Sequence, residues 1–468
     1  MISTQESIVS INPATGEELG RVPIYSAPDV SDAVHRVRVA QPAWNNLSFR
    51  ERGKVIMRAR RIILDEIDEI AQLISRETGK PIPEAISMEI TPALDLMQYF
   101  ARQAAKFLKS QKINLGMFKL LGRTSRIVYK PYGVIGIISP WNFPWSVPIG
   151  GVVMALMAGN GVVLKPSELT PLTGLKIGDV LLRGGLPHDL VQVVTGDGST
   201  GAALIEAGTD KICFTGSVET GKRIAQTAAR TLTPVLLELG GKDPMIVLED
   251  SNLEAAARGA VWGAFANSGQ ACASVERCYV HESIAEFFIN RVVELTGGLK
   301  QGNGCEDSVD IGAMSSERQL KIVEEHVQDA VSNGARILIG GTRLLESAQP
   351  GGLFFAPTVL SGVNHTMKIM REETFGPVLP VMTFRHESEA IEWANKSTFG
   401  LTASVWTCDL KRGRRIAEKL EAGTVTVNEV LYTHAIPQTP WGGVKQSGQG
   451  RTHGRLGLLE LVLPQHVH

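Results

Sequence analysis

Residues 131–164 read PYGVIGIISPWNFPWSVPIGGVVMALMAGNGVVL and contain no charged side chain and no histidine. Such a run is long enough to suggest a membrane-spanning helix. Three prolines interrupt it, however, at Pro140, Pro144 and Pro148, and Asn142 lies among them. An isolated lipid-facing helix tolerates prolines poorly, because each removes a backbone donor and clashes with the preceding turn. We therefore predict a buried strand, a functional loop and the start of a helix, with no membrane span.

From about residue 126, short β-branched runs alternate with helical segments. This pattern is typical of an α/β fold with parallel sheets and helices on their faces. A second alternation follows Glu238, so we place a domain boundary near Gly240-Gly241. The predicted strands are 134–138, 162–164, 190–194, 211–214 and 235–237, then 244–248, 337–339, 378–384, 403–406 and 424–428. The predicted helices are 148–158, 171–184, 199–207 and 219–230, then 253–267, 316–333, 386–396 and 409–422.

Outside this alternation, residues 60–78 show apolar side chains at helical spacing, with Gly79 as a plausible stop. They predict one amphipathic helix. Residues 111–129 and the tail near 455–465 have the composition of strands.

The composition limits the class of protein. A chain of 468 residues usually forms two or three domains, and 43% apolar with 20% charged residues is typical of a soluble globular protein. The formal net charge of -1 and the lack of a long basic run provide no electrostatic case for nucleic acid or an anionic membrane. Five cysteines without a C-x-x-C pair argue against a disulfide framework or a metal site and for a reducing compartment. The N-terminus lacks the pattern of a secretory signal, so we expect a cytoplasmic protein.

The strongest chemical signal is Cys272, which ends the small-residue loop NSGQAC, together with Glu238, which follows an apolar run. An ionised thiol is a strong nucleophile, and a carboxylate within reach can act as a general base. Taken alone, such a pair is more often a buried structural cysteine and a surface glutamate. Neighbouring motifs must decide between these readings.

Two segments compete for the phosphates of a dinucleotide. Residues 196–201, GDGSTG, match the G-x-G-x-x-G pattern after a strand, but Asp197 places a negative charge where phosphate would lie. In the rival, residues 214–222, Gly216 permits a tight turn and Ser217 can cap a helix whose N-terminus attracts phosphate. In addition, Lys165 and Glu168 follow a strand and can bind ribose hydroxyls, although a solvated salt bridge is the ordinary alternative.

Together these residues resemble the NAD(P)-dependent aldehyde dehydrogenase superfamily. Seven motifs occur in the family's order and near its spacing: Pro140-Trp141-Asn142-Phe143-Pro144, Lys165-Pro166-Ser167-Glu168, Phe214-Thr215-Gly216-Ser217, Glu238-Leu239-Gly240-Gly241-Lys242, Gly269-Gln270-Ala271-Cys272, Glu372-Glu373-Thr374-Phe375-Gly376-Pro377 and Pro440-Trp441-Gly442-Gly443-Val444-Lys445. The resemblance implies a Rossmann-like cofactor-binding domain (residues 1–110 and 130–239), an α/β catalytic domain (240–439), and a small β oligomerisation extension with the C-terminal tail (111–129 and 440–468). It also implies a homodimer or homotetramer.

The resemblance implies a role for each matching residue. Cys272 would be the nucleophile, Asn142 the oxyanion donor and Glu238 the base that hydrolyses the thioester left by hydride transfer. The presence of Glu238 favours a free carboxylic acid over transfer to coenzyme A. The implied contacts to the cofactor are Lys165 and Glu168 at the adenosine ribose, Ser217 and Gly216 at the pyrophosphate, Glu373 and Phe375 at the nicotinamide end, and Trp141.

Glu168 favours NAD, although relatives with the same motif also use NADP. Aromatic residues Phe143, Trp145, Tyr432 and Trp441 indicate a mouth for an apolar aldehyde, unless they serve only in packing. Two departures from the family bear on the substrate: Trp441 replaces a common Phe, and Thr452-His453 stands where many members have Glu. The alternatives are a semialdehyde dehydrogenase with an anionic substrate, a non-catalytic nucleotide-binding relative, or a thiol hydrolase that uses the same Cys and Glu.

Overall fold

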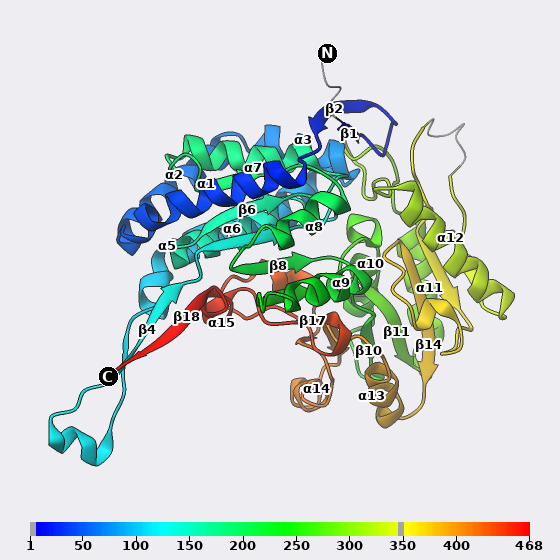
Figure 1. Cartoon of the computed structure of the whole chain (residues 1–468). Coiled ribbons are helices and arrows are strands. Elements are labelled where there is room, and N and C mark those ends of the chain that lie inside the picture. Colours follow the sequence, from blue (N-terminus) through cyan, green and yellow to red (C-terminus); the bar gives the residue numbers. More distant parts are fainter. Residues whose placement is uncertain (1–5, 345–350) are drawn as a thin grey trace.

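The computed structural model describes residues 6–344 and 351–468. Two large sheets with helices on their faces lie side by side, and a narrow arm projects from the first (Figure 1). The predicted α/β class is confirmed. A two-stranded ribbon, β1 (Ser7–Ile11) and β2 (Glu18–Pro23), lies at the N-terminal end. None of the helices in the described ranges combines the length and apolar character needed to cross a bilayer.

The first sheet has the order β17-β9-β8-β5-β6-β7, and all neighbours are parallel except β17 and β9. Its strands are β5 (Val134–Ile138), β6 (Gly161–Lys165), β7 (Val191–Val193), β8 (Lys211–Thr215), β9 (Val235–Glu238) and β17 (Gly448–Gln449). Helices cover both faces: α1 (Ala27–Asn45), α2 (Phe49–Asp65), α3 (Ile67–Thr78), α4 (Ile82–Glu84), α5 (Thr91–Phe107), α6 (Ser146–Ala158), α7 (Pro171–Arg183), α8 (Gly198–Glu206) and α9 (Val218–Ala229), with the π-helical segment η1 (Ala85–Ile90).

Alternate residues of β5 explain why this sheet is sandwiched between helices. Ile135 and Ile137 belong to the core cluster shared with α2, α5 and α6, whereas Val134 and Ile138 belong to the cluster shared with α1, α8 and α9. Successive side chains of a strand point to opposite faces, so a strand that is apolar throughout must be covered twice. The charge-free stretch thus divides as predicted into β5, a loop and α6, followed by β6.

The chain crosses to the second sheet between β9 and β10, at Gly240 and Gly241. The second sheet has the order β12-β13-β14-β11-β10-β15-β16, parallel except for β12 against β13. Its strands are β10 (Asp243–Val247), β11 (Val275–His281), β12 (Arg336–Ile339), β13 (Thr358–Ser361), β14 (Val378–Phe384), β15 (Thr402–Trp406) and β16 (Thr424–Val427). Its helices are α10 (Leu253–Phe265), α11 (Ala285–Gly297), α12 (Glu317–Ser332), α13 (Glu387–Asn395) and α14 (Leu410–Ala417).

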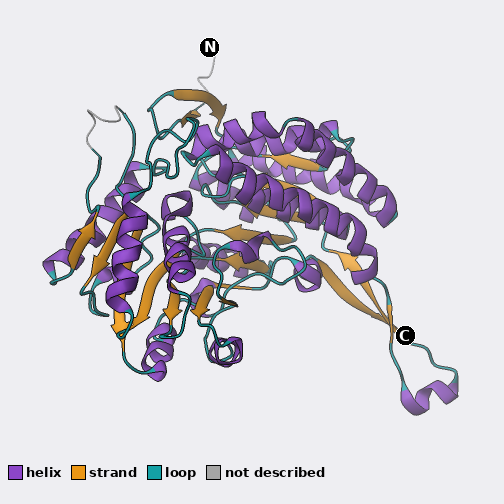
Figure 2. Ribbon diagram, turned by 180° about the vertical axis from the view of Figure 1, so that it is seen from behind, coloured by secondary structure: helices purple, strands orange, loops and turns teal. Residues whose placement is uncertain are grey.

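The arm is an antiparallel sheet of the order β18-β4-β3, built from β3 (Gln111–Lys112), β4 (Arg126–Pro131) and β18 (Val462–Val467). Figure 2 shows it from behind, with a short helix at its far end. That helix is the 3₁₀ turn η2 (Gly116–Leu121), and a second helix, α15 (Gly454–Leu459), precedes β18. The prediction of strands over 111–129 and 455–465 was therefore wrong for these two helical segments.

The prediction of one helix over 60–78 was also wrong. The structure ends α2 at Asp65 and starts α3 at Ile67, because Glu66 leaves the helical region with φ -114° and ψ 22°. The remaining predicted strands and helices occur near their predicted positions. Residues 277–280 have the composition of a strand, and they form only part of β11. The elements β1, β2, α1, α5, β13 and α11 were not predicted.

Candidate active site

The candidate site lies where the carboxyl ends of the first sheet meet the amino ends of the second. Glu238 is the last residue of β9, and Cys272 lies in the loop that precedes β11. The Cys272 Sγ is 4.0 Å from Glu238 Oε1. The two residues that the sequence singled out are therefore neighbours, each supplied by a different sheet.

An unusual backbone holds the cysteine loop. Asn267, Ser268 and Gly269 have φ values of 54°, 55° and 68°, three consecutive residues in the left-handed region. A Cβ on Gly269 would overlap the carbonyl of Gly376, so only glycine fits there. The backbone amide of Asn267 donates to Glu84 Oε2 at 2.9 Å, which anchors the loop to the helices of the first sheet. The surrounding contacts thus maintain a strained turn, as is common at functional sites.

Burial, followed by the nearby carboxylates of Glu238, Asp243 and Glu373, raises the pKa of the Cys272 thiol well above its ordinary value. Burial also raises the pKa of Glu238 to about 7, against the lowering effect of its hydrogen bonds from Trp441 and Thr215. A carboxylate with a pKa near neutrality is a better proton acceptor than an ordinary glutamate, because the efficiency of a general base increases with its pKa.

A buried hydrogen-bond network positions Asn142. Its side-chain amide donates to the Gln270 carbonyl at 2.9 Å, which ties it to the cysteine loop. The backbone carbonyl of Asn142 accepts from Lys80 Nζ at 2.8 Å and from Asn267 Nδ2 at 3.0 Å. Lys80 is in turn paired with Glu89 at 2.6 Å. Neither Lys80 nor Glu89 was singled out from the sequence, since buried charges have no periodic signal.

The predicted cofactor residues follow the carboxyl edge of the first sheet. Lys165 ends β6, Ser217 follows β8, and the edge between them passes β5. The chain order reverses between β5 and β8, and open α/β sheets bind ligands at such a switch point. Three strand intervals separate β9 from β6, or about 14 Å. Lys165 therefore lies far from Cys272, as an extended ligand requires.

The residues along this edge offer the donors that a dinucleotide needs. Ser217 caps α9 and is exposed, so the helix N-terminus faces solvent. Lys165 Nζ is 3.3 Å from the half-exposed Glu168 carboxylate, and burial lowers the pKa of this lysine. The buried Ser139 hydroxyl, one residue beyond β5, has no protein partner within the described residues. Helix N-termini bind phosphate, and Lys and Glu side chains bind ribose hydroxyls, so the set fits such a cofactor.

The competing loop at 196–201 is already satisfied. The Asp197 side chain caps α8 and accepts from the Ser199 amide at 2.8 Å. A carboxylate thus occupies the helix N-terminus that a phosphate would need. This geometry favours the Ser217 segment over the G-x-G-x-x-G match.

Glu373 and Phe375 approach from the loop before β14. The Glu373 carboxylate accepts from the Gly241 amide at 2.9 Å, and burial raises its pKa to about 8. Phe375 packs edge-on against Trp141, with ring centroids 5.4 Å apart. Glu276 holds this loop by accepting from the Phe375 amide at 2.8 Å. Of the ten predicted site residues, six therefore meet where the two sheets approach each other: Trp141, Asn142, Glu238, Cys272, Glu373 and Phe375. The other four, Lys165, Glu168, Gly216 and Ser217, lie along the carboxyl edge of the first sheet.

Comparisons with known proteins agree with this geometry. A family model described as the aldehyde dehydrogenase family matches residues 1–467. This chain belongs to the aldehyde dehydrogenase family. It is an oxidoreductase that converts an aldehyde to a carboxylic acid with NAD or NADP.

Individual relatives cover nearly the whole chain. A 4,4'-diapolycopene aldehyde oxidase from Methylomonas is 42% identical over 98% of this chain and 85% of its own length. A putative succinate-semialdehyde dehydrogenase (NADP+) from Mycobacterium tuberculosis is 39% identical over 97% of this chain and 86% of its own length. An aldehyde dehydrogenase from Bacillus cereus in complex with NAD+ has a TM-score of 0.94 and 35% identity, covering 99% of this chain and 93% of that one.

Trp441, where the aldehyde dehydrogenase motif usually has Phe, is not at an open mouth. It is 1% exposed, and its indole N–H donates to Glu238 Oε1. The sequence related this departure to the substrate, and the structure shows that it reaches the catalytic candidates too, because the indole contacts the carboxylate beside Cys272. His434 and His453 pack beyond it, and burial lowers the pKa of His434 to about 4.

Trp145 is a second correction. It is fully buried in the core beneath α6 and lines no opening. Among the aromatics predicted for the mouth, Tyr432 is half exposed and Phe143 is partly buried.

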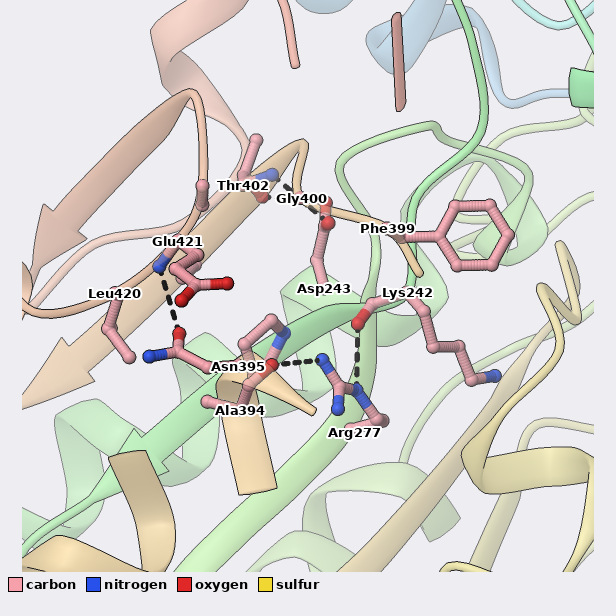
Figure 3. A pocket seen from close by; sticks show the side chains of 13 residues that line it. Lys242, Asp243, Arg277, Ala394, Asn395, Phe399, Gly400, Thr402, Leu420 and Glu421 are labelled. Carbon is pink, nitrogen blue, oxygen red and sulfur yellow. Dashed lines mark hydrogen bonds between the residues drawn. The ribbon is translucent and has the colours of Figure 1, made fainter. Parts of the chain in front are cut away.

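Arg277 cannot anchor an anionic substrate. Its guanidinium donates to the backbone carbonyls of Lys242, Trp393 and Ala394 at 2.8–3.0 Å. Figure 3 shows it in a small cavity beside Asp243, whose lining includes neither Cys272 nor Glu238.

Proposed function

We propose that Cys272, Glu238 and Asn142 carry out the chemistry of this aldehyde dehydrogenase and that its substrate is an apolar aldehyde. The observation that most directly supports this proposal is the distance of 4.0 Å between Cys272 Sγ and Glu238 Oε1, which come from different sheets. The Cys272 thiol, once deprotonated, attacks the aldehyde carbon. The Asn142 amide and the Cys272 backbone N–H stabilise the developing oxyanion.

Loss of hydride from this adduct leaves a thioester on Cys272, and bound NAD(P)+ supplies the hydride acceptor. Glu238 then removes a proton from water, which attacks the thioester and releases the carboxylic acid. Trp441 stabilises the carboxylate form of Glu238 through its indole N–H. A carboxylate at this point favours hydrolysis over transfer of the acyl group to another thiol.

We assign the cofactor contacts to Trp141, Lys165, Glu168, Gly216, Ser217, Glu373 and Phe375. Glu168 would repel the 2′-phosphate of NADP, which supports NAD as the preferred cofactor. The proposed division into a cofactor-binding part, a catalytic part and an arm is supported by the three sheets, except that β17 of the C-terminal segment pairs with β9 of the first sheet. The outer strands β3 and β18 of the arm have free edges within the described residues, which supports strand pairing between subunits of a homodimer or homotetramer. A cytoplasmic location remains our expectation from the sparse cysteines.

Two observations support the substrate class. Cys272 packs against a cluster of Ala273, Leu401 and Trp441, so the thiol has apolar surroundings. Arg277, the arginine closest in sequence to Cys272, donates from each of its three nitrogens to a backbone carbonyl. The name of the Methylomonas relative supports the same class, whereas that of the mycobacterial relative favours an anionic semialdehyde.

We expect a panel of aldehydes to separate these two classes. With NAD, kcat/KM should rise up to about fourfold per added methylene in a series of linear alkanals, the value of one buried CH₂. Succinate semialdehyde should be a poorer substrate than a neutral aldehyde of equal length, and NADP a poorer cofactor than NAD. Absence of NADH or NADPH formation with every aldehyde would contradict the assigned chemistry, and preference for the semialdehyde would contradict the substrate class.

Replacing Trp441 by Phe should shift the pH profile of deacylation. The variant keeps an aromatic ring but loses the donor to Glu238, so the pKa of this carboxyl should rise from about 7. A hydrogen bond to a charged group corresponds to about one pH unit in the midpoint. The rate should therefore reach its plateau at higher pH, measured on a substrate whose deacylation limits kcat.

The matched control is Trp406→Phe. Trp406 is also buried and donates to Ser404 at 3.3 Å, within the second sheet. Its substitution should leave the midpoint unchanged. An unchanged midpoint in the Trp441 variant would show that the indole N–H does not lower the pKa of Glu238.

A further inference from the structure

Two lysine–glutamate pairs lie wholly inside the protein. Lys80 Nζ is 2.6 Å from Glu89, and Lys242 Nζ is 2.5 Å from Glu276. Among the ion pairs within residues 6–344 and 351–468, only these two have both side chains at most 6% exposed. The desolvation of two buried charges can cost as much free energy as their attraction returns, so such a pair contributes little to stability. What distinguishes each pair is the backbone segment that it holds.

The pair Lys80–Glu89 fixes the segment that carries Asn142. Lys80 Nζ donates to the backbone carbonyl of Asn142 at 2.8 Å. Glu89 accepts from the backbone amides of Trp145 and Ser146 at 2.8 and 3.0 Å, at the point where α6 begins. The segment between β5 and α6 is therefore held at both ends, which restricts the direction of the Asn142 side chain.

The pair Lys242–Glu276 fixes the loop that carries Glu373 and Phe375. Glu276 accepts from the backbone amides of Thr374 and Phe375, each at 2.8 Å. Lys242 Nζ donates to the hydroxyl of Thr374 at 3.1 Å. Phe375 has a φ of 53°, a strained conformation for a residue with a side chain, and these bonds help to maintain it. The pair thus orients the two residues that we assign to the nicotinamide end of the cofactor.

The two pairs act on different segments of the site. Lys80 and Glu89 lie among the helices of the first sheet, whereas Glu276 lies in β11 of the second. We propose that the pairs are separate positioning devices: Lys80–Glu89 sets the oxyanion donor Asn142, and Lys242–Glu276 sets the loop that binds the nicotinamide end. Donors that are held in place before the reaction need no reorganisation in the transition state. The inference rests on the proposed function, because that function assigns the roles of the two segments.

Two probes separate the two roles. The Cys272 thiolate can attack p-nitrophenyl acetate without any nucleotide: the acetyl group moves to sulfur, nitrophenolate leaves, and water then releases acetate. This reaction develops an oxyanion but transfers no hydride, so it needs Asn142 and not the cofactor loop. Binding of NADH, followed by its fluorescence, needs the cofactor loop and no oxyanion.

The variants replace each pair by neutral side chains. One combines Lys80→Met with Glu89→Gln, and the other combines Lys242→Met with Glu276→Gln. Replacing both partners avoids leaving one charge buried and alone. Glutamine also keeps an oxygen that can accept from a backbone amide.

The chain offers a matched control in Lys211→Met with Glu460→Gln. Lys211 Nζ is 3.0 Å from Glu460, and the lysine side chain is only 3% exposed. Lys211 begins β8, at the end of the strand opposite to the site. This double variant also removes a lysine–glutamate pair, and both probes should give wild-type values.

We expect the Lys80/Glu89 variant to release nitrophenolate about 10²-fold more slowly, the usual cost of a lost oxyanion donor. The burst of NADH with an aldehyde should slow by a similar factor, because the same donor serves both reactions. The Kd for NADH should stay at the wild-type value.

The Lys242/Glu276 variant should show the reverse pattern. The Kd for NADH should rise about tenfold, as for one misplaced hydrogen bond to a charged group. Nitrophenolate release without nucleotide should stay at the wild-type rate. With a deuterated aldehyde, NADH formation should show a larger isotope effect than in the wild type, because hydride transfer has become slower.

Equal losses on both probes within each variant, or losses that the control shares, would make the pairs general stabilisers of the fold and overturn the proposal. Wild-type values on both probes in both variants would overturn it too. If circular dichroism shows that a double variant does not fold, Glu89→Gln or Glu276→Gln alone takes its place, with the same expected pattern. Failure of the proposed function has another signature: Cys272→Ala would then release nitrophenolate as fast as the wild type, whatever the pair variants do.

Discussion

Cys272→Ala should abolish aldehyde oxidation, including the first turnover. The reaction needs a covalent bond between Sγ and the aldehyde carbon, and alanine offers no nucleophile. Losing a nucleophile that acts together with its base typically lowers kcat by about 10⁴-fold or more. Rapid mixing with NAD and aldehyde should therefore show neither a burst nor a steady rise of NADH.

The structure supplies controls for this prediction. Cys408 is exposed and outside the site, so Cys408→Ala should keep full activity. NADH binding, followed by protein fluorescence, should survive in the Cys272 variant, since the predicted cofactor contacts lie on other residues. A burst of normal amplitude in Cys272→Ala would show that a group other than Cys272 is the nucleophile. Loss of NADH binding would indicate a collapsed site instead.

Much of the fold was predictable because its signals are local. The strand β5 and the middle residues of β6 and β8 are apolar runs, and in a parallel sheet covered on both faces such runs stand out from their surroundings. Strand β11 shows where this logic fails. Glu276 and Arg277 lie inside it, and only the folded chain supplies their partners: Lys242 forms an ion pair with Glu276, and backbone carbonyls accept hydrogen bonds from Arg277. The sequence alone therefore revealed only a strand-like run near Cys278.

The candidate site shows the same limit. Cys272, Glu238 and Asn142 belong to motifs, so their types and order indicated the chemistry. The partners that hold them do not: Lys80 reaches Asn142 across the core, and Trp441 reaches Glu238 from the C-terminal segment. Such contacts between distant segments depend on tertiary packing. The one sequence signal for Trp441 was its departure from the Phe of the family motif.

Glu238→Gln should separate the two halves of the reaction. Glutamine has the same shape, and its amide oxygen can still accept from the Trp441 indole, so the geometry is kept while the base is lost. We expect a burst of one NADH per active subunit followed by a steady rate lower by about 10²–10⁴-fold, the usual contribution of a general base. Stopped-flow absorbance provides both quantities, and mass spectrometry should find the acyl group on Cys272.

The deacylation rate should depend on pH in the wild type. Because the pKa of Glu238 is raised to about 7, the wild-type deacylation rate should increase as pH rises through that value and the carboxyl ionises. The Glu238→Gln variant should lack this increase of rate with pH.

Hydroxylamine, a stronger nucleophile than water, should release the trapped acyl group and restore turnover without the base. A variant that turns over steadily at the wild-type rate, with the same dependence on pH, would show that another group activates the water. If instead the burst itself disappears while NADH binding persists, Glu238 is also needed earlier, to take the proton from the Cys272 thiol 4.0 Å away.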